Sequence, residues 1–104
     1  MCYTEKGSYK MLEKEIERKL VKGVKKLGGL CYKFESPESS GVPDRIVILN
    51  GRVIFVEVKA ESGRLSSMQH YRLTQLQSCK ANVRVLYGAE QVKAFLAELA
   101  GGLQ

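Results

Sequence analysis

The sequence has few of the residues from which zinc sites and disulfide frameworks are built. Its three cysteines are widely spaced, no Cys-x-x-Cys motif occurs, and there is one histidine. This set indicates neither a zinc site nor a disulfide framework. We expect Cys31 and Cys79 to be buried as small apolar residues and Cys2 to be a free thiol. The single histidine, His70, falls in a predicted helix, where surface exposure or packing is its ordinary role.

The chain also lacks long apolar runs, internal repeats and any composition shift that would mark a linker. No apolar run approaches the roughly 20 residues of a membrane span, and the first six residues do not read as a signal peptide. The length of 104 residues, with 44% hydrophobic and 27% charged residues, predicts one cytosolic globular domain over residues 1–104. We expect residues 1–10, which are polar, to form a flexible N-terminal segment.

Acidic residues are outnumbered, with 11 Asp and Glu against 17 Lys and Arg and a net charge of +6. Solubility alone would explain this balance. A polyanionic partner is the more specific explanation, because neutralisation of phosphates by Lys and Arg supplies much of the affinity of proteins for nucleic acids. Carboxylates grouped within a basic chain favour the second explanation, since a basic surface attracts the phosphate and a local acidic pocket can hold a metal ion.

The strongest local pattern predicts a β-hairpin. Two runs rich in β-branched residues, 45–49 and 52–59, flank the pair Asn50-Gly51. A two-residue turn needs positive φ at both positions, which Asn and Gly adopt readily. Apolar side chains alternate onto both faces of the two runs. We therefore expect the hairpin to be central in a sheet, with other elements packed on both sides.

Counting from the turn brings two carboxylates together at the open end of the hairpin. Asp44 falls opposite Glu57, and Lys59 shares their face. Carboxylates at cross-strand positions destabilise a sheet, so a cation is needed to offset them. Lys59 is one candidate, as a structural salt bridge, and a bound divalent metal is the other.

Helical and strand patterns frame this hairpin. An apolar period of three and four residues over Leu12, Ile16, Leu20, Val24 (or Val21) and Leu27 predicts a first helix. A capping box of Ser66 with Gln69 begins the next helix, which should bury Met68, Leu73 and Leu76, with Tyr71 as a further candidate. The predicted elements are a helix over 11–27, strands over 30–34, 45–49 and 52–59, a helix from 66 to about 80, a strand over 82–87 and a helix over 90–100. The order α-β-β-β-α-β-α indicates an α/β fold, a mixed sheet flanked by helices.

Two polar residues of these helices have alternative roles. Glu17 adjoins the apolar stripe of the first helix, so it could point toward the sheet, but periodicity alone favours a surface role or an ion pair with a lysine. Gln69 suits the capping bond with Ser66. It also begins a helix near the carboxylates, where it could contact a phosphate or water.

Together these residues resemble the PD-(D/E)xK nuclease superfamily and, within it, the VRR-NUC family. Pro43-Asp44 is followed, after twelve intervening residues, by Glu57-x-Lys59. The wider match takes in Gly-Val-Pro-Asp-Arg from Gly41, Phe-Val-Glu-Val-Lys from Phe55, and Gly63 to Gln69. It covers most of residues 11–97 in the expected order of elements. The resemblance implies a restriction-endonuclease-like fold of the short, stand-alone phage and bacterial type, and hence a bacterial or phage-infected cytoplasm.

The resemblance also implies a metal site. Asp44, Glu57 and the backbone carbonyl of Val58 would ligate Mg²⁺ or Mn²⁺, which suit hard oxygen ligands. Lys59 would orient or help deprotonate the attacking water and stabilise charge on the phosphorane. The reaction implied is metal-assisted hydrolysis of a phosphodiester.

Further roles follow from the same resemblance. Glu17 matches the acidic residue of the family's first helix and would complete the acidic set, with Glu13 as the alternative. Gln69 matches a helix-borne glutamine of the site. One departure concerns the loop before Gly41: many relatives carry basic residues there, whereas this chain has Glu38, Ser39 and Ser40.

The substrate implied is DNA. Stand-alone members of the family are similar to junction resolvases, so we expect a homodimeric, structure-selective endonuclease acting on branched DNA such as a Holliday junction, with paired cuts made by two sites across a two-fold axis. No membrane partner is indicated. Two alternatives stay open: a nuclease acting on linear or flapped DNA, and a catalytically silent DNA-binding or assembly module that keeps the fold.

Overall fold

The computed structural model describes residues 11–101, so the expectations for residues 1–10 and for Cys2 lie outside the described residues. The elements are α1 (Glu13–Lys26), β1 (Leu30–Lys33), β2 (Arg45–Leu49), β3 (Arg52–Lys59), α2 (Ser67–Ser78), β4 (Asn82–Tyr87) and α3 (Gly88–Gly101). This order, α-β-β-β-α-β-α, confirms the predicted fold class.

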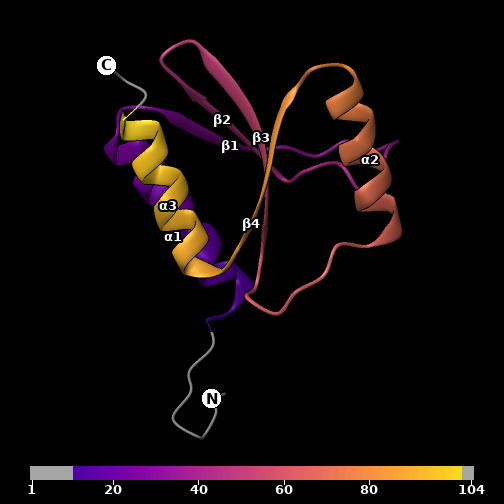
Figure 1. The fold of residues 1–104 in the computed structure, drawn as a ribbon, viewed down its shortest axis with the longest axis horizontal. Helices are drawn as coiled ribbons and strands as arrows, with labels where there is room; N and C mark the ends of the chain where they lie inside the picture. The colour runs from indigo at the N-terminus through magenta and orange to yellow at the C-terminus, as the bar shows by residue number, and fades with distance from the viewer. Residues whose placement is uncertain (1–10, 102–104) are drawn as a thin grey trace, which may run out of the picture.

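The sheet is mixed and has the strand order β1-β2-β3-β4. The first two pairings are antiparallel, and β3 pairs with β4 in parallel. A parallel pairing needs a crossover connection, which α2 supplies here. Figure 1 shows α1 and α3 together on one side of the sheet and α2 on the other. The hairpin strands β2 and β3 are therefore central, as predicted.

The turn of the hairpin has the predicted geometry. Asn50 and Gly51 have φ values of 55° and 82°, and the pairing runs from Leu49–Arg52 to Arg45–Val56 in the predicted register. The ladder ends there, one pair earlier than predicted, because Asp44 lies in a bend before β2. The carbonyl of Asp44 instead accepts a hydrogen bond of 2.6 Å from the Phe34 backbone N–H.

The face of the sheet toward α1 and α3 is closed by apolar packing. Of the predicted helix stripe, Leu12 is exposed and Leu27 is partly buried against the core. Ile16, Leu20 and Val24 are buried there against Val47, Ile54 and Val56 from the central strands and Val92, Phe95 and Leu99 from α3. These side chains are at most 2% exposed. Most of the hydrophobic stabilisation of the described residues lies on this side, since burial of apolar area is its source.

The opposite face is only partly covered. Leu73 of α2 is buried, but Met68 is 40% and Tyr71 54% exposed, and Cys79 is exposed while Cys31 is half-buried. The predicted burial of Met68 and Cys79 is therefore wrong, because α2 covers only part of this face. At the hairpin end beyond α2, the apolar side chains of Leu30, Tyr32 and Val53 are about half exposed. Between residues 11 and 101, no helix has the length and apolar character needed to cross a membrane.

Candidate active site

Glu57 is the one buried charged residue within the part of the chain that the structure describes, with 3% of its surface exposed. It lies near the end of β3, on the face toward α2. The pKa of its carboxyl group is raised to about 7, mainly by burial, because the charged form loses its hydration. The charges of Asp44 and Glu13 also contribute to this rise, whereas the Lys59 ammonium and a hydrogen bond with the Asp44 backbone lower the pKa. A carboxyl group with such a pKa is typical of functional sites.

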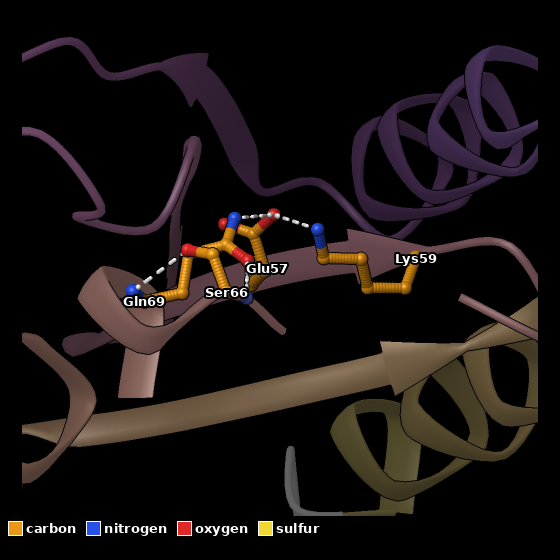
Figure 2. A network of polar contacts seen from close by, with 4 residues as sticks. All are labelled: Glu57, Lys59, Ser66 and Gln69. Carbon is orange, nitrogen blue, oxygen red and sulfur yellow. Dashed lines mark hydrogen bonds and ion pairs between the residues drawn. The ribbon is translucent and has the colours of Figure 1, made fainter. Parts of the chain in front are cut away.

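Lys59 and Gln69 both approach the same carboxylate oxygen (Figure 2). The Lys59 Nζ lies 3.9 Å from Glu57 Oε2, and the Gln69 Nε2 donates a hydrogen bond of 3.2 Å to that oxygen. The shared face of Glu57 and Lys59, expected from strand alternation, is therefore present. These two contacts fix the orientation of the carboxylate from both sides.

Gln69 makes the capping bond that the sequence allowed and, in addition, contacts Glu57. Its Oε1 accepts a hydrogen bond of 2.8 Å from the Ser66 backbone N–H, and its own N–H donates to Ser66 Oγ at 3.1 Å, which completes the capping box. Since its amide nitrogen is left to donate to Glu57, one side chain both begins α2 and supports the site.

The other carboxylate oxygen of Glu57 has a different environment. Oε1 is buried and has no hydrogen-bond partner among the described residues. A buried, unsatisfied carboxylate oxygen is costly, and a metal ion is one ligand that would satisfy it. The donor set of carboxylate and carbonyl oxygens fits Mg²⁺ or Mn²⁺. Residues 11–101 contain no group of three or more His, Cys, Asp and Glu gathered as a metal cage. Mg²⁺ needs no such cage, because it binds through one or two carboxylates and keeps several waters.

The loop that carries Asp44 is fixed to the beginning of α2. Gly41 has a φ of 88°, and a Cβ at this position would lie 2.7 Å from the backbone oxygen of Met68. Only glycine allows this approach without strain. Arg72 adds a hydrogen bond of 2.9 Å from its Nε to the carbonyl of Ser40. The half-buried Asp44 and the site residue Gln69 are thus held by one loop–helix contact.

The two acidic candidates of α1 differ in their surroundings. Glu17 pairs with Arg45, with 2.6 Å between its Oε2 and the arginine Nε, and both side chains are about one-fifth exposed. Glu13 is the α1 carboxylate whose charge contributes to the raised pKa of Glu57. Glu17 is therefore in an ion pair, as its position on α1 allowed, but its partner is an arginine of the sheet and not a lysine.

Arg45 is the residue near the site to which the sequence alone assigned no role. It follows Asp44 directly and, by strand alternation, points to the opposite face, toward α1. The alternation was readable in the sequence, but the partner of Arg45 depends on how α1 is rotated against the sheet. His70, the only histidine, is exposed on α2.

Comparisons with known proteins support the family resemblance and the fold. The sequence model of the VRR-NUC domain matches residues 8–90. A protein of Acyrthosiphon pisum secondary endosymbiont phage 1, named "Putative nuclease p44", is 50% identical over 68 residues, which are 62% of this chain and 73% of that protein. A solved structure described as a VRR_NUC domain superposes with a TM-score of 0.76 at 29% identity, over 82% of this chain and 94% of that one.

Proposed function

The chain belongs to the VRR-NUC family, and from this premise we propose that it is a metal-dependent, structure-selective DNA endonuclease. Its substrate is branched DNA, with the four-way Holliday junction as the first candidate, and its active form is a homodimer in the cytoplasm of a bacterial or phage-infected cell. The homologue's name as a nuclease supports hydrolysis of a nucleic acid. The basic composition supports a polyanionic substrate.

The observation that carries this proposal is the environment of Glu57. A nearly fully buried carboxyl group with a raised pKa is oriented by Lys59 and Gln69 and has one unsatisfied oxygen. Burying a carboxylate this way costs stability. The arrangement is typical of a site kept for a ligand.

We assign the metal to Asp44, Glu57 and the backbone carbonyl of Val58. When bound, Mg²⁺ or Mn²⁺ polarises a phosphoryl oxygen and lowers the pKa of a bound water. Gln69 holds the Glu57 carboxylate through Oε2, so that Oε1 stays available to the metal. Lys59, close to the same carboxylate, is placed to orient the attacking water and to stabilise negative charge on the phosphorane.

For the acidic residue of the first helix, Glu13 has better support than Glu17. Its charge acts on the Glu57 carboxyl group, whereas Glu17 is paired with Arg45. We therefore assign Glu13 to the acidic set and give Glu17 the role of holding Arg45.

The homodimer is supported by the uncovered part of the sheet. Leu30, Ile48 and Val53 are cross-strand neighbours on the face beyond α2, and Leu30, Val53 and the adjacent Tyr32 are about half exposed. Paired cuts in a symmetric junction need two sites related by a two-fold axis, and such an axis brings one patch onto its own copy. We therefore expect Tyr32→Glu to shift the mass measured by light scattering from dimer to monomer.

The test compares a labelled four-way junction with a linear duplex of the same sequence, with Mg²⁺ or Mn²⁺ and with EDTA. Unmutated protein, Asp44→Ala and Lys59→Ala are assayed for cleavage and for binding. We expect metal-dependent cutting of the junction, which both variants lose while they still bind it.

Other results redirect the proposal. Equal cutting of junction and duplex would keep the nuclease and remove the structure selectivity. Cutting that survives both substitutions would place the chemistry elsewhere. Tight junction binding without any cutting by the unmutated protein would leave a DNA-binding module.

A further inference from the structure

A groove of about 400 Å³ lies beside the proposed site, on the other face of the sheet, between α1, β1 and β2. Five of its lining residues are cationic and one is acidic. The cationic residues are Lys14, Arg18 and Lys22 of α1, Lys33 of β1 and Arg45 of β2, and the acidic residue is Glu17. The charge of Glu17 is matched by its ion pair with Arg45. The remaining four side chains give the groove a local excess of positive charge.

The arrangement of these charges on α1 is unfavourable without a partner. Lys14, Arg18 and Lys22 are spaced by four residues, so they form a row along one side of the helix. Like charges at this spacing destabilise a helix by roughly 0.2–0.5 kcal/mol per pair. Lys33, the neighbour of Arg45 in the β1–β2 ladder, adds another positive charge across the groove. A bound polyanion would turn this repulsion among the cationic side chains into a net attraction to the ligand.

The groove begins one residue from the acidic groups of the site. Lys14 follows Glu13 in α1, and Arg45 follows Asp44 at the start of β2. The loop on the other side of Asp44 has the opposite character, since residues 35–40 include two glutamates and no lysine or arginine. A DNA strand whose scissile phosphate lies at the site would therefore be attracted along the groove and repelled by the loop.

We propose that this groove binds the backbone phosphates of the DNA strand next to the scissile bond. The inference rests on the proposed nuclease function and adds the direction in which the strand leaves the site, over α1 and β1. Lys14, Arg18 and Lys33 contact phosphates, and Glu17 fixes Arg45 between the groove and the carboxylates. These contacts are independent of base sequence, as backbone contacts are.

A second groove provides a matched control. It has a volume of about 560 Å³, lies between α1 and α3, and is lined by Lys19, Lys26 and Lys93. Lys22 lines both grooves and is left unchanged in both variants. All six substituted side chains are exposed. The triple variant Lys14→Ala, Arg18→Ala, Lys33→Ala therefore removes the same charge from the proposed track as Lys19→Ala, Lys26→Ala, Lys93→Ala removes from the control surface.

The experiment measures binding of a fluorescent four-way junction by anisotropy in EDTA over a series of salt concentrations. Each lost phosphate contact lowers the slope of log K against log salt by about 0.9. For the first triple variant we expect a slope smaller by about 2–3 and an affinity about tenfold weaker or more near physiological salt. The control triple variant should keep the slope and affinity of the unmutated protein.

The single variants Lys14→Gln and Lys33→Gln repeat the test if the triple variant folds poorly, and each should lower the slope by about 0.9. Equal effects of the two triple variants, or an unchanged slope in the first, would overturn the groove as the DNA track. In both cases cleavage by the unmutated protein leaves the nuclease proposal standing. A protein that neither binds nor cuts DNA removes both proposals.

Discussion

The two faces of β3 show how one strand serves two purposes. Ile54 and Val56 point toward α1 and α3 and are fully buried in an apolar core. Phe55, Glu57 and Lys59 point the other way, where the carboxyl group of Glu57 is buried and Val53 is half exposed. On the first face burial stabilises the fold. On the second, burial of a carboxylate lowers the stability of the fold and prepares the ligand site.

The largest expected effect comes from Glu57→Gln, which removes a charge from the functional face while conserving shape. We expect cleavage to fall by about 10³-fold or more, because this side chain contributes to the metal site and an amide is a poor ligand for Mg²⁺. The measurement is the single-turnover cleavage rate at saturating protein. Val58→Ala is the matched control, since Val58 is the next residue, faces the core and keeps its backbone carbonyl. The cleavage rate of folded Val58→Ala should stay within a few-fold of that of the unmutated protein. A loss as large as that of Glu57→Gln would show that catalysis does not depend on one face of β3 alone.

The core face is tested by stability instead. Ile54→Ala should lower the free energy of unfolding by about 2–5 kcal/mol, because it removes buried methyl groups and leaves a cavity. Val53→Ala is the control on the other face. The Val53 side chain is 50% exposed, so its loss should cost about 1 kcal/mol or less. Urea denaturation at one pH measures both, and similar costs would mean that the two faces contribute equally to stability.

Much of the fold could be predicted from local patterns. The Asn50-Gly51 turn fixes the hairpin, and because side chains alternate along a strand, the turn also fixes which residues share a face. The three- and four-residue period of α1 likewise includes the buried residues Ile16, Leu20 and Val24, although Leu12, which belongs to the same period, is exposed. These features depend on neighbours in the sequence, so no information about distant contacts is needed.

The parts that sequence did not settle depend on contacts between distant elements. The end of the ladder before Asp44 depends on the path of the loop, which Gly41 fixes against Met68. The exposure of Met68 and Cys79 depends on how far α2 covers the sheet. The pairing of Glu17 with Arg45 depends on the rotation of α1 about its axis.

The functional face should also have its own pH dependence, which sharpens the comparison. The pKa of Glu57 is raised from its ordinary value of 4.5 to about 7, so between these values the folded state holds a proton that the unfolded state has released. The free energy of unfolding of the metal-free protein should therefore fall as pH rises from 4.5 through 7. The expected loss from this group is about 3 kcal/mol, present in full above pH 7.

Urea denaturation in EDTA at pH 5 and pH 8 measures this effect as the difference between the unmutated protein and Glu57→Gln. The variant carries no titrating group at this position. Its free energy of unfolding, compared with that of the unmutated protein, should therefore be higher at pH 8 than at pH 5. A difference that is the same at both pH values would show that Glu57 is already ionised in the folded state at pH 5.

The smallest expected effects distinguish the roles of Glu13 and Glu17, the two candidate carboxylates of α1. Glu13→Gln removes a charge that acts on Glu57, so it should weaken the metal dependence: we expect about tenfold more Mg²⁺ or Mn²⁺ at half-maximal cleavage, as is typical when a supporting group of a metal site is lost. Glu17→Gln breaks the ion pair with Arg45, which is about one-fifth exposed, so it should cost about 1 kcal/mol or less of stability and leave the metal titration unchanged. Metal titrations of both variants on the same junction decide between them. If Glu17→Gln shifts the metal requirement and Glu13→Gln does not, Glu17 belongs to the acidic set and its pairing with Arg45 must break when the metal binds.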